Sequence, residues 1–183
     1  IKDLRLRHPS IDLDCFSPIE IEGIADVCNM TTLQVLTKMK SVGLHGLPGG
    51  GAEMLVDDVR LDVSPKKGGA TNWLRVMEEA QTLGLVTSAT NVIGFGETNE
   101  QRVGHMNAIR KLQDKSIFNN LEGFTSFVAW PVQLENNVFG KVSKRNNVNN
   151  LGSNPNDYLR HIAISRLFLD NVEHIQSSWP TMG

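Results

Sequence analysis

The chain has 183 residues, of which 40% are hydrophobic and 21% charged, and its formal net charge is −2. This composition is typical of a soluble globular protein, and the absence of a basic block argues against nucleic acid or an anionic membrane as a partner. No apolar run approaches the roughly 20 residues of a membrane span, and no secretory signal is visible at the start. The two cysteines do not make a disulfide framework. We therefore expect a cytoplasmic protein in which Cys15 and Cys28 are buried or half-buried thiols.

Short β-branched or apolar runs alternate with longer helical patterns from the start of the chain. Residues 11–15 form the first strand candidate, which ends before Pro18 because proline cannot continue a central strand. Two helices are expected next, over residues 20–28 and 31–42, the second capped by a threonine and closed by Gly43. The spacing of this second helix predicts a buried face made of Leu33, Leu36 and Met39.

The next strand and helix flank a glycine-rich turn. Residues 44–47 form a short strand that runs into Pro-Gly-Gly-Gly, and a helical turn is expected over residues 57–61. Thr71 is predicted to cap a helix over residues 72–83, which Gly84 ends. The core face of this helix is predicted to comprise Trp73, Met77 and Ala80.

A long strand and a well-marked helix start follow. Residues 86–93 form the strand, and Thr98 with Gln101 makes a capping box that opens a helix reaching about Asp114. Residues 123–130 form the next strand. The polar, asparagine-rich stretch 133–154 is interpreted as a long loop.

The last helix and strand complete a regular alternation. Asn154 caps a helix that begins at Pro155, and residues 174–179 form the final strand. Five strands at intervals of about 30 to 50 residues are typical of parallel βαβ units. The predicted buried stripe of the last helix consists of Leu159, Ile162, Ala163 and Leu167.

We therefore predict an α/β fold with about five βα units, in one domain spanning residues 1–183. A complete (β/α)8 barrel needs about 250 residues, so the prediction is part of a parallel TIM-type barrel. A doubly wound open sheet would also bind its ligand at the carboxyl ends of the strands.

Residues with unusual chemistry follow the predicted strands, on the face where parallel barrels carry their active sites. The glycine triplet 49–51 either lets the backbone approach a ligand or forms a turn that only glycine can make. Glu53 could accept hydrogen bonds from an ammonium or a hydroxyl, or could be a solvated surface residue. Glu97 could contact a ligand, or its negative charge could stabilise the start of the next helix. Trp130 and Trp179 end strands and could stack on aromatic rings.

The five histidines share no metal-ligand spacing, and no Cys/His cluster has zinc spacing, so we expect no metal site in this chain. His45 is the best candidate for a ligand contact, because it lies in a short strand beside the glycine triplet. The others are expected to be structural or exposed: His8, His105, His161 and His174.

Several motifs together resemble one enzyme family. Residues 43–55, which contain the glycine triplet and Glu53, are similar to the radical S-adenosylmethionine enzymes of the futalosine route to menaquinone. So are residues 63–66 and 94–98. The tail, residues 164–183, is most similar to the branch that cyclises dehypoxanthine futalosine. Aminofutalosine synthase and the deazaflavin-cofactor synthases are also similar, but more so in the first half of the chain than in the tail.

The resemblance implies a barrel in which a 4Fe–4S cluster reduces S-adenosylmethionine, and the resulting 5′-deoxyadenosyl radical starts the cyclisation of dehypoxanthine futalosine in menaquinone biosynthesis. A small-molecule substrate and an electron donor for the cluster would be the partners. The implied contacts to S-adenosylmethionine are Ser17, Glu53, Arg60, Thr90, Val92, Gly94 and Glu97, with Arg60 able to bind a carboxylate bidentately. The substrate contacts are expected at His45, Gly50, Gly51, Trp130, Gln133, Ser177 and Trp179.

One departure from the family concerns the cluster. The family binds it through a Cys-x-x-x-Cys-x-x-Cys loop, which is not found here, and Cys15 and Cys28 cannot replace it. The cluster ligands and the first two strands are therefore expected outside this chain, and the chain alone is expected to have no cluster and no turnover. Residues 129–137 also depart from the usual strand end. Two other interpretations are a non-catalytic barrel fragment and a cluster-free barrel lyase, in which Glu53 would work with a lysine such as Lys66.

Overall fold

The computed structural model of the chain describes residues 1–145 and 151–182. Its centre is a four-stranded parallel sheet in the order β1-β2-β3-β4. The strands are β1 (Gly46–Leu47), β2 (Val86–Ile93), β3 (Phe124–Pro131) and β4 (His174–Ser177). The predicted α/β class is thus confirmed, and the parallel sheet is consistent with part of a βα barrel.

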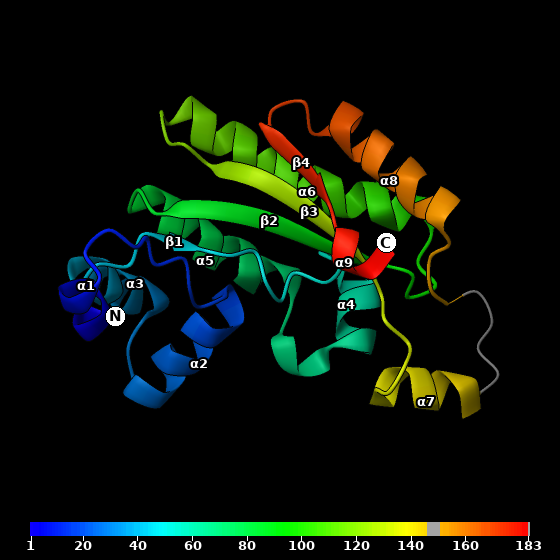
Figure 1. Cartoon of the computed structure of the whole chain (residues 1–183), viewed down its shortest axis with the longest axis horizontal. Helices are drawn as coiled ribbons and strands as arrows, with labels where there is room; N and C mark the ends of the chain where they lie inside the picture. The colour runs from blue at the N-terminus through cyan, green and yellow to red at the C-terminus, as the bar shows by residue number, and fades with distance from the viewer. Residues whose placement is uncertain (146–150, 183) are drawn as a thin grey trace.

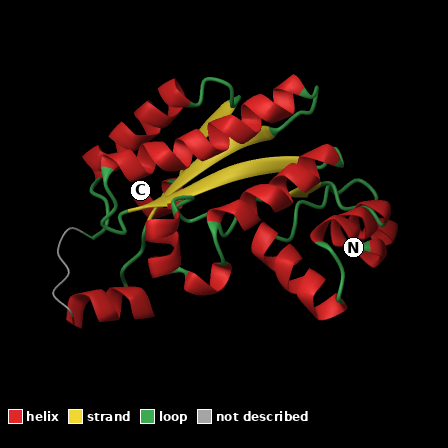
Figure 2. Cartoon of the chain, turned by 180° about the vertical axis from the view of Figure 1, so that it is seen from behind, coloured by secondary structure: helices red, strands yellow, loops and turns green. Residues whose placement is uncertain are grey.

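Helices cover one face of this sheet. Figure 1 looks onto the other face, with α5 and α6 behind the strands, and Figure 2 shows the helices in front of the sheet. Shorter helices, α4, α7 and α9, follow the carboxyl ends of the strands. The helical elements are α1 (Lys2–Arg7), α2 (Pro18–Cys28), α3 (Thr32–Ser41), α4 (Asp57–Val63), a 3-10 turn (Pro65–Lys67), α5 (Ala70–Thr82), α6 (Asn99–Phe118), α7 (Val138–Arg145), α8 (Pro155–Phe168) and α9 (Trp179–Met182).

The core lies between the sheet and the helices behind it. Trp73 of α5 is fully buried and its ring stacks on Phe124 of β3, with 6.0 Å between the ring centroids. Met77 and Ala80 are also fully buried, which confirms the predicted core face of α5. Alternate residues of β2 are buried against the helices, and those between them are half-exposed on the other face. That half-exposed face positions the candidate site.

Local signals at helix ends are confirmed where both partners lie within one turn. Thr98 Oγ1 accepts from the backbone N–H of Gln101 (3.2 Å), and the Gln101 side chain accepts from the backbone N–H of Thr98 (2.8 Å). Asn154 Oδ1 accepts from the backbone N–H of Asp157 (2.9 Å) at the start of α8. Gly43 and Gly84 follow their helices at φ of 103° and 69°, a conformation that favours glycine.

The predicted first strand is wrong. Residues 11–15 run beside β1 but make one isolated bridge, between Asp14 and Gly46. The reason is His45, whose Nδ1 accepts from the backbone N–H of Leu13 (3.0 Å) and takes the place of a ladder partner. The described part of the chain therefore has four strands in its sheet rather than the five expected.

Several element boundaries also differ from the prediction. Helix α5 begins at Ala70, one residue before the expected cap, because Asp57 Oδ1 accepts from the backbone N–H of Ala70 (2.7 Å). Helix α6 continues past residue 114 to Phe118, and the stretch predicted as a loop contains α7. The last strand ends at Ser177, and α9 begins at Trp179.

Two predicted buried stripes are only partly confirmed. In α3, Leu36 is buried but Leu33 is 43% exposed. In α8, Leu159 and Leu167 are 62% and 81% exposed, and Ala163 also lies on the exposed side. The side chains that α8 buries are polar or carry a polar group, so apolar spacing did not identify its inner face: Tyr158, His161 and Ser165. In α3, Thr32 is buried beside Val35 and Leu36, and its hydroxyl donates to Glu79 (2.6 Å). Cys28 is exposed rather than buried.

Tyr158 joins α8 to the last two strands. Its hydroxyl donates to the carbonyl of Ala129 (2.7 Å) and accepts from the backbone N–H of Ser178 (2.6 Å), and the residue is 2% exposed. Tyr158→Phe leaves both buried backbone groups without a partner, so we expect the free energy of unfolding to fall by about 1–3 kcal/mol. Urea denaturation measures this change. Thr37→Val is the control, because its hydroxyl bond is exposed, and an equal loss in the two variants would contradict the prediction.

Candidate functional site

Two adjoining cavities lie on the half-exposed face of the sheet, at the carboxyl ends of the strands. The first, of about 430 Å³, is bounded by the glycine loop after β1 and by residues of β2 and β3. The second, of about 610 Å³, extends from there toward α4 and α7. The two cavities share Glu53, Val92 and Trp130, so we describe them as one site.

The structure brings together half of the predicted contact residues. Lining the cavities are Gly50, Gly51, Glu53, Thr90, Val92, Trp130 and Gln133. The sequence interpretation missed several others, among them Ser88, Val128, Lys67 and Phe139. The signal for two of these was available, because Ser88 and Val128 alternate with buried residues along β2 and β3 and therefore face the site.

The glycine triplet is explained mainly by close packing. A Cβ on Gly49 would lie 2.5 Å from the carbonyl oxygen of Ser88, and a Cβ on Gly51 would lie 2.6 Å from Ile19. Gly51 also has a φ of 78°, in the left-handed region. Gly50 has more room, with Ser17 as its neighbour, and it faces the smaller cavity. Structure alone therefore accounts for two of the three glycines: Gly49 by its close approach to β2, and Gly51 by its turn conformation.

Glu53 is held in an uncommon backbone conformation where the two cavities meet. Its φ of 48° is in the left-handed region, which costs a non-glycine residue about 1 kcal/mol or more. Its carbonyl accepts from the backbone N–H of Val92 (2.8 Å) and from Asn91 Nδ2 (2.9 Å). Its side chain is 17% exposed and pairs with the ammonium of Lys67. The two hydrogen bonds from β2 therefore fix the backbone of Glu53, from which the carboxylate extends.

Arg60 does not line the cavities; it binds the loops beside them. The residue is fully buried, and its guanidinium donates to the carbonyls of Gly68 (2.8 Å), Gly51 (2.8 Å), Ala52 (2.5 Å) and Lys67 (3.3 Å). Burial lowers the pKa of this guanidinium, and the charges of Glu53 and Asp57 oppose that shift. The expectation that Arg60 binds a ligand carboxylate is therefore corrected: this side chain holds the loops that flank the cavity.

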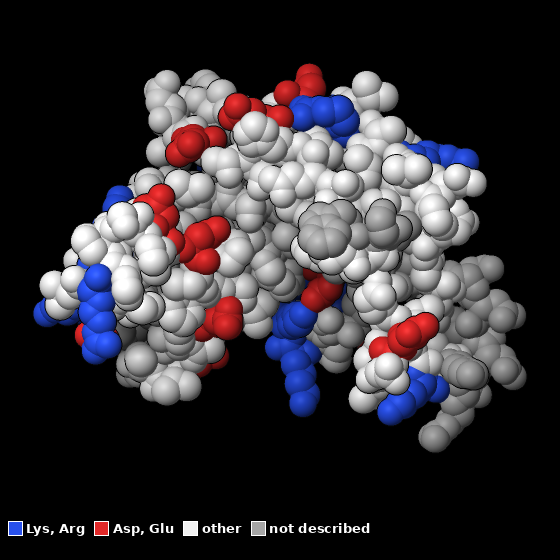
Figure 3. All heavy atoms as spheres, viewed as in Figure 1, with Lys and Arg blue, Asp and Glu red and all other residues white. Residues whose placement is uncertain are grey.

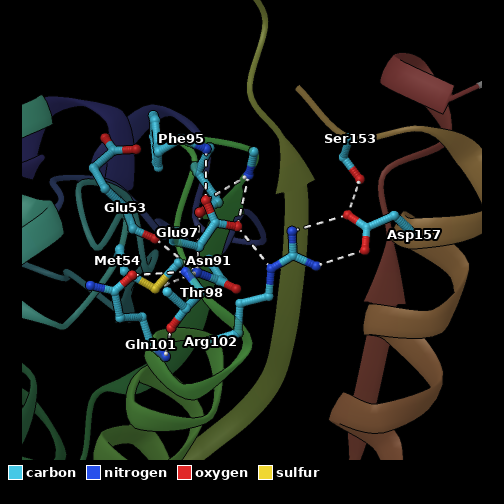
Figure 4. A network of polar contacts seen from close by, with 12 residues as sticks. Glu53, Met54, Asn91, Phe95, Glu97, Thr98, Gln101, Arg102, Ser153 and Asp157 are labelled. Carbon is cyan, nitrogen blue, oxygen red and sulfur yellow. Dashed lines mark hydrogen bonds and ion pairs between the residues drawn. The ribbon is translucent and has the colours of Figure 1, made fainter. Parts of the chain in front are cut away.

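A network of carboxylates around Arg102 shapes the loop after β2. Glu97 accepts from the backbone N–H groups of Gly94 (2.9 Å) and Phe95 (2.7 Å), and Arg102 Nε donates to Glu97 (2.8 Å). The two terminal nitrogens of Arg102 donate to both oxygens of Asp157, each at 3.0 Å. Figure 4 shows Arg102 between Glu97 and Asp157, so this network ties the loop to the start of α8.

The electrostatics of this network are those of a structural ion cluster. The Arg102 hydrogen bond holds the pKa of Asp157 below its usual range. Burial lowers the pKa of Arg102, but its two carboxylate partners outweigh burial and raise it overall. The side chain of Glu97 is fully buried, so it meets the loop backbone and Arg102 instead of a ligand. A Cβ on Gly94 would lie 2.7 Å from the backbone of Gly152, so a chain segment occupies the space beside Gly94, where a ligand contact was expected.

The remaining predicted contacts lie at the edge of the site or outside it. Ser17 donates to Glu20 (2.8 Å) at the start of α2. The side chain of His45 accepts from the backbone N–H of Leu13, as described above, and His45 lines neither cavity. Ser177 pairs with Ala129, whose side chain faces the helices, so Ser177 points away from the cavity. The side chain of Trp179 lies outside what the structure describes.

Three further features of the described chain concern metal ligands, surface charge and membrane-spanning helices. Within residues 1–145 and 151–182, no three His, Cys, Asp or Glu side chains are grouped to hold a metal ion, and both cysteines are free. Figure 3 shows basic and acidic side chains in small separate groups on this face of the molecule. None of the described helices is both long and apolar enough to span a membrane.

Comparison with known proteins identifies a matching family. Residues 121–183 match the family model described as the CofH/MqnC C-terminal region. The chain is 40% identical over its whole length to the cyclic dehypoxanthine futalosine synthase of Halalkalibacterium halodurans, and covers 46% of that protein. The resemblance stated from the sequence motifs is thereby confirmed.

Relatives with other names are also similar. The aminodeoxyfutalosine synthase of Thermus thermophilus is 32% identical over the whole chain, which covers 46% of it. The 5-amino-6-(D-ribitylamino)uracil–L-tyrosine 4-hydroxyphenyl transferase of Methanosphaerula palustris is 36% identical over 96% of the chain, which covers 46% of it. The chain thus spans under half the length of the curated relatives that it matches.

Proposed function

Since residues 121–183 match the CofH/MqnC C-terminal region, we propose that the chain is the ligand-binding part of a radical S-adenosylmethionine barrel enzyme. The observation that carries the proposal is Glu53, a carboxylate held in a left-handed conformation where two cavities meet at the strand ends. Non-glycine residues in this conformation are concentrated at ligand sites, where the surrounding structure maintains the strain. The full-length protein would use a small-molecule substrate and an electron donor.

The residues of the site are suited to S-adenosylmethionine. The carboxylate of Glu53 would accept hydrogen bonds from its ammonium group. Thr90 and Val92, on the cavity face of β2, would lie against the adenine. The second cavity is lined by Phe95, Trp130 and Phe139, and these aromatic faces would pack on the ring of an aromatic substrate.

The described residues do not fit an iron–sulfur cluster. They contain no grouped set of three ligands, and neither Cys15 nor Cys28 belongs to a three-cysteine loop. When bound elsewhere in the full-length protein, such a cluster supplies an electron to S-adenosylmethionine. What this chain contributes is binding, orientation and exclusion of water on the substrate side.

The reaction we propose for the full-length protein is the cyclisation of dehypoxanthine futalosine to cyclic dehypoxanthine futalosine in menaquinone biosynthesis. Support comes from the relative of that name at 40% identity over all 183 residues. The alternatives are the reactions of the other named relatives, aminodeoxyfutalosine synthesis and 4-hydroxyphenyl transfer. A cluster-free lyase using Lys66 is less well supported, because Lys66 is exposed and a Schiff-base lysine needs burial.

Anaerobic reconstitution of the full-length protein tests the proposal. We expect iron and sulfide to be bound in equal amounts, and 5′-deoxyadenosine to form when S-adenosylmethionine, a reductant and dehypoxanthine futalosine are supplied. Parallel reactions with the substrates of the alternative relatives distinguish the three reactions by mass spectrometry of the product. Iron and sulfide near zero, or a full-length sequence without a three-cysteine loop, would overturn the radical mechanism.

A further inference from the structure

Helix α8, which Figure 1 shows at the outside of the molecule, carries an apolar stripe on its exposed face. Leu159 and Leu167 are 62% and 81% exposed, and Ala163 between them is exposed as well. These three residues are spaced four apart, so their side chains lie in one row on the helix surface. Because the inner face of α8 is the polar one, its polarity is the reverse of that expected for a helix whose outer face meets water.

The stripe continues toward the neighbouring helix. Ile164 of α8 and Val103 of α6 are both more than 40% exposed, and both line the narrow cleft between the two helices. Apolar residues exposed singly are ordinary, whereas a contiguous apolar group marks an interaction surface. We call this group the α8 patch: Val103, Leu159, Ala163, Ile164 and Leu167.

The position of the stripe favours a partner outside the layer of helices that covers the sheet. Successive helices of a parallel α/β fold pack side by side on the sheet and cover one another's flanks. The stripe instead lies opposite the buried row of Tyr158, His161 and Ser165, since successive residues of a helix are about 100° apart. A further helix of the same layer would therefore leave the stripe exposed.

The pattern of the stripe is self-complementary. A twofold interface uses the same surface on both subunits, so that surface must fit its own copy. The sequence of the stripe is symmetric about Ala163, with a leucine four residues to either side. Two antiparallel copies of α8 that cross at Ala163 would place Leu159 against the partner's Leu167. The small alanine at the crossing point allows the two backbones to approach closely.

The charges beside the stripe match the same arrangement. Arg160 is exposed on the N-terminal half of α8, and Asp170 is exposed just beyond its C-terminal end. In an antiparallel pair, Arg160 extends toward the C-terminal end of the other helix and therefore toward the partner's Asp170. The partial charges of the two helix ends also face their opposites. Both contacts occur twice in a twofold pair.

We propose that two copies of the protein associate through the α8 patch, with their α8 helices antiparallel and Ala163 beside the twofold axis. The inference is independent of the proposed reaction, because the patch does not include the cavities at the strand ends. A 14-residue helix is about 21 Å long. A contact along one pair of such helices is smaller than a standard interface of roughly 1,200–2,000 Å², so we expect a dimer that dissociates on dilution.

Analytical ultracentrifugation of the full-length protein at several concentrations tests the inference. We expect a monomer–dimer equilibrium, and we expect Ala163→Glu to raise its dissociation constant by about tenfold or more, because the twofold axis brings the two new carboxylates together. Val27→Glu is the matched control, since Val27 is 88% exposed but lies on α2, and it should leave the equilibrium unchanged. A protein that is monomeric at every concentration, or a dimer that Ala163→Glu leaves intact, would overturn the proposal.

A charge exchange provides a second reading that does not depend on how Ala163→Glu folds. Arg160→Asp should weaken the dimer by about fivefold, because it places a carboxylate near the partner's Asp170. Adding Asp170→Arg to the same chain should restore the dimer, since the two charges are then exchanged in both copies. Circular dichroism checks that each variant is folded. Failure of the double variant to recover dimerisation would rule out the antiparallel pair, and loss of stability without dissociation would show that the stripe packs against the rest of its own chain.

Discussion

Arg60→Leu is expected to lower the free energy of unfolding by about 3–5 kcal/mol, because it removes a buried charged partner from several backbone groups at once. The guanidinium accounts for hydrogen bonds to four carbonyls in two loops, and the residue is fully buried. Leucine is of smaller volume and can donate to none of them. Each carbonyl would then lose the partner that compensates for its burial.

Two further variants show whether the loss comes from the geometry of Arg60. Arg60→Lys keeps the positive charge but not the planar fork, so its loss should fall between those of the unsubstituted protein and Arg60→Leu. Arg75→Leu is the matched control, since the side chain of Arg75 is 44% exposed and its pairs with Glu22 and Glu79 lie at the surface. Such pairs contribute about 0–1 kcal/mol. Urea denaturation of all three would contradict the prediction if Arg60→Leu and Arg75→Leu lost the same stability.

Local patterns were sufficient to predict much of this fold. Strand β2 was predicted over residues 86–93, its exact extent in the structure, because a β-branched run bounded by glycines has few alternatives. The helix starts at Thr98 and Asn154 were also correct, since each cap binds a backbone group three residues away. The expected strand at 11–15 failed because its partner is a side chain 32 residues further on, that of His45.

The residues of the site were harder to predict, because they are brought together by contacts between residues far apart in the sequence. Strand ends were correctly expected to contribute the cavity, and Glu53, Val92 and Trp130 lie where its two parts meet. Arg60 was expected at the ligand because a guanidinium can bind a carboxylate bidentately; its burial depends on carbonyls that only the folded loops bring together. The charge partner of Glu53, Lys67, lies in a loop whose conformation has no local sequence signal.

Acidification from pH 8 to pH 5 is expected to cost about 4 kcal/mol of stability through two buried histidines, about 2 kcal/mol for each. Burial, reinforced by the charges of His161 and Arg60, lowers the pKa of His105 from 6.5 to about 3. Burial and the charge of Arg102 lower the pKa of His161 to about 4, although Asp157 and Glu97 oppose the shift. His105 must stay neutral in the fold, because its Nδ1 accepts from the backbone N–H of Leu55 (2.9 Å).

The direction of this pH effect follows from which state takes up protons. As the pH falls through about 6.5, both histidines become protonated in the unfolded chain but stay neutral in the native protein, so the unfolded state is stabilised. Asp157 acts in a different range: its pKa is lowered by Arg102, so its contribution is lost only below its ordinary value of 3.8. A comparison of pH 8 with pH 5 therefore isolates the two histidines from that carboxylate.

The double variant His105→Gln, His161→Gln provides the test, because glutamine has no titratable group. Its free energy of unfolding at pH 8 will be lower than that of the unsubstituted protein, since two packed rings are lost. The difference between pH 8 and pH 5, however, should shrink by about 4 kcal/mol, and by about half of that for either single variant. His8→Gln is the control, because His8 is exposed and its replacement should leave the pH dependence unchanged. An unchanged pH dependence in the double variant would show that these rings are hydrated or paired in the fold, and that their burial does not keep them neutral.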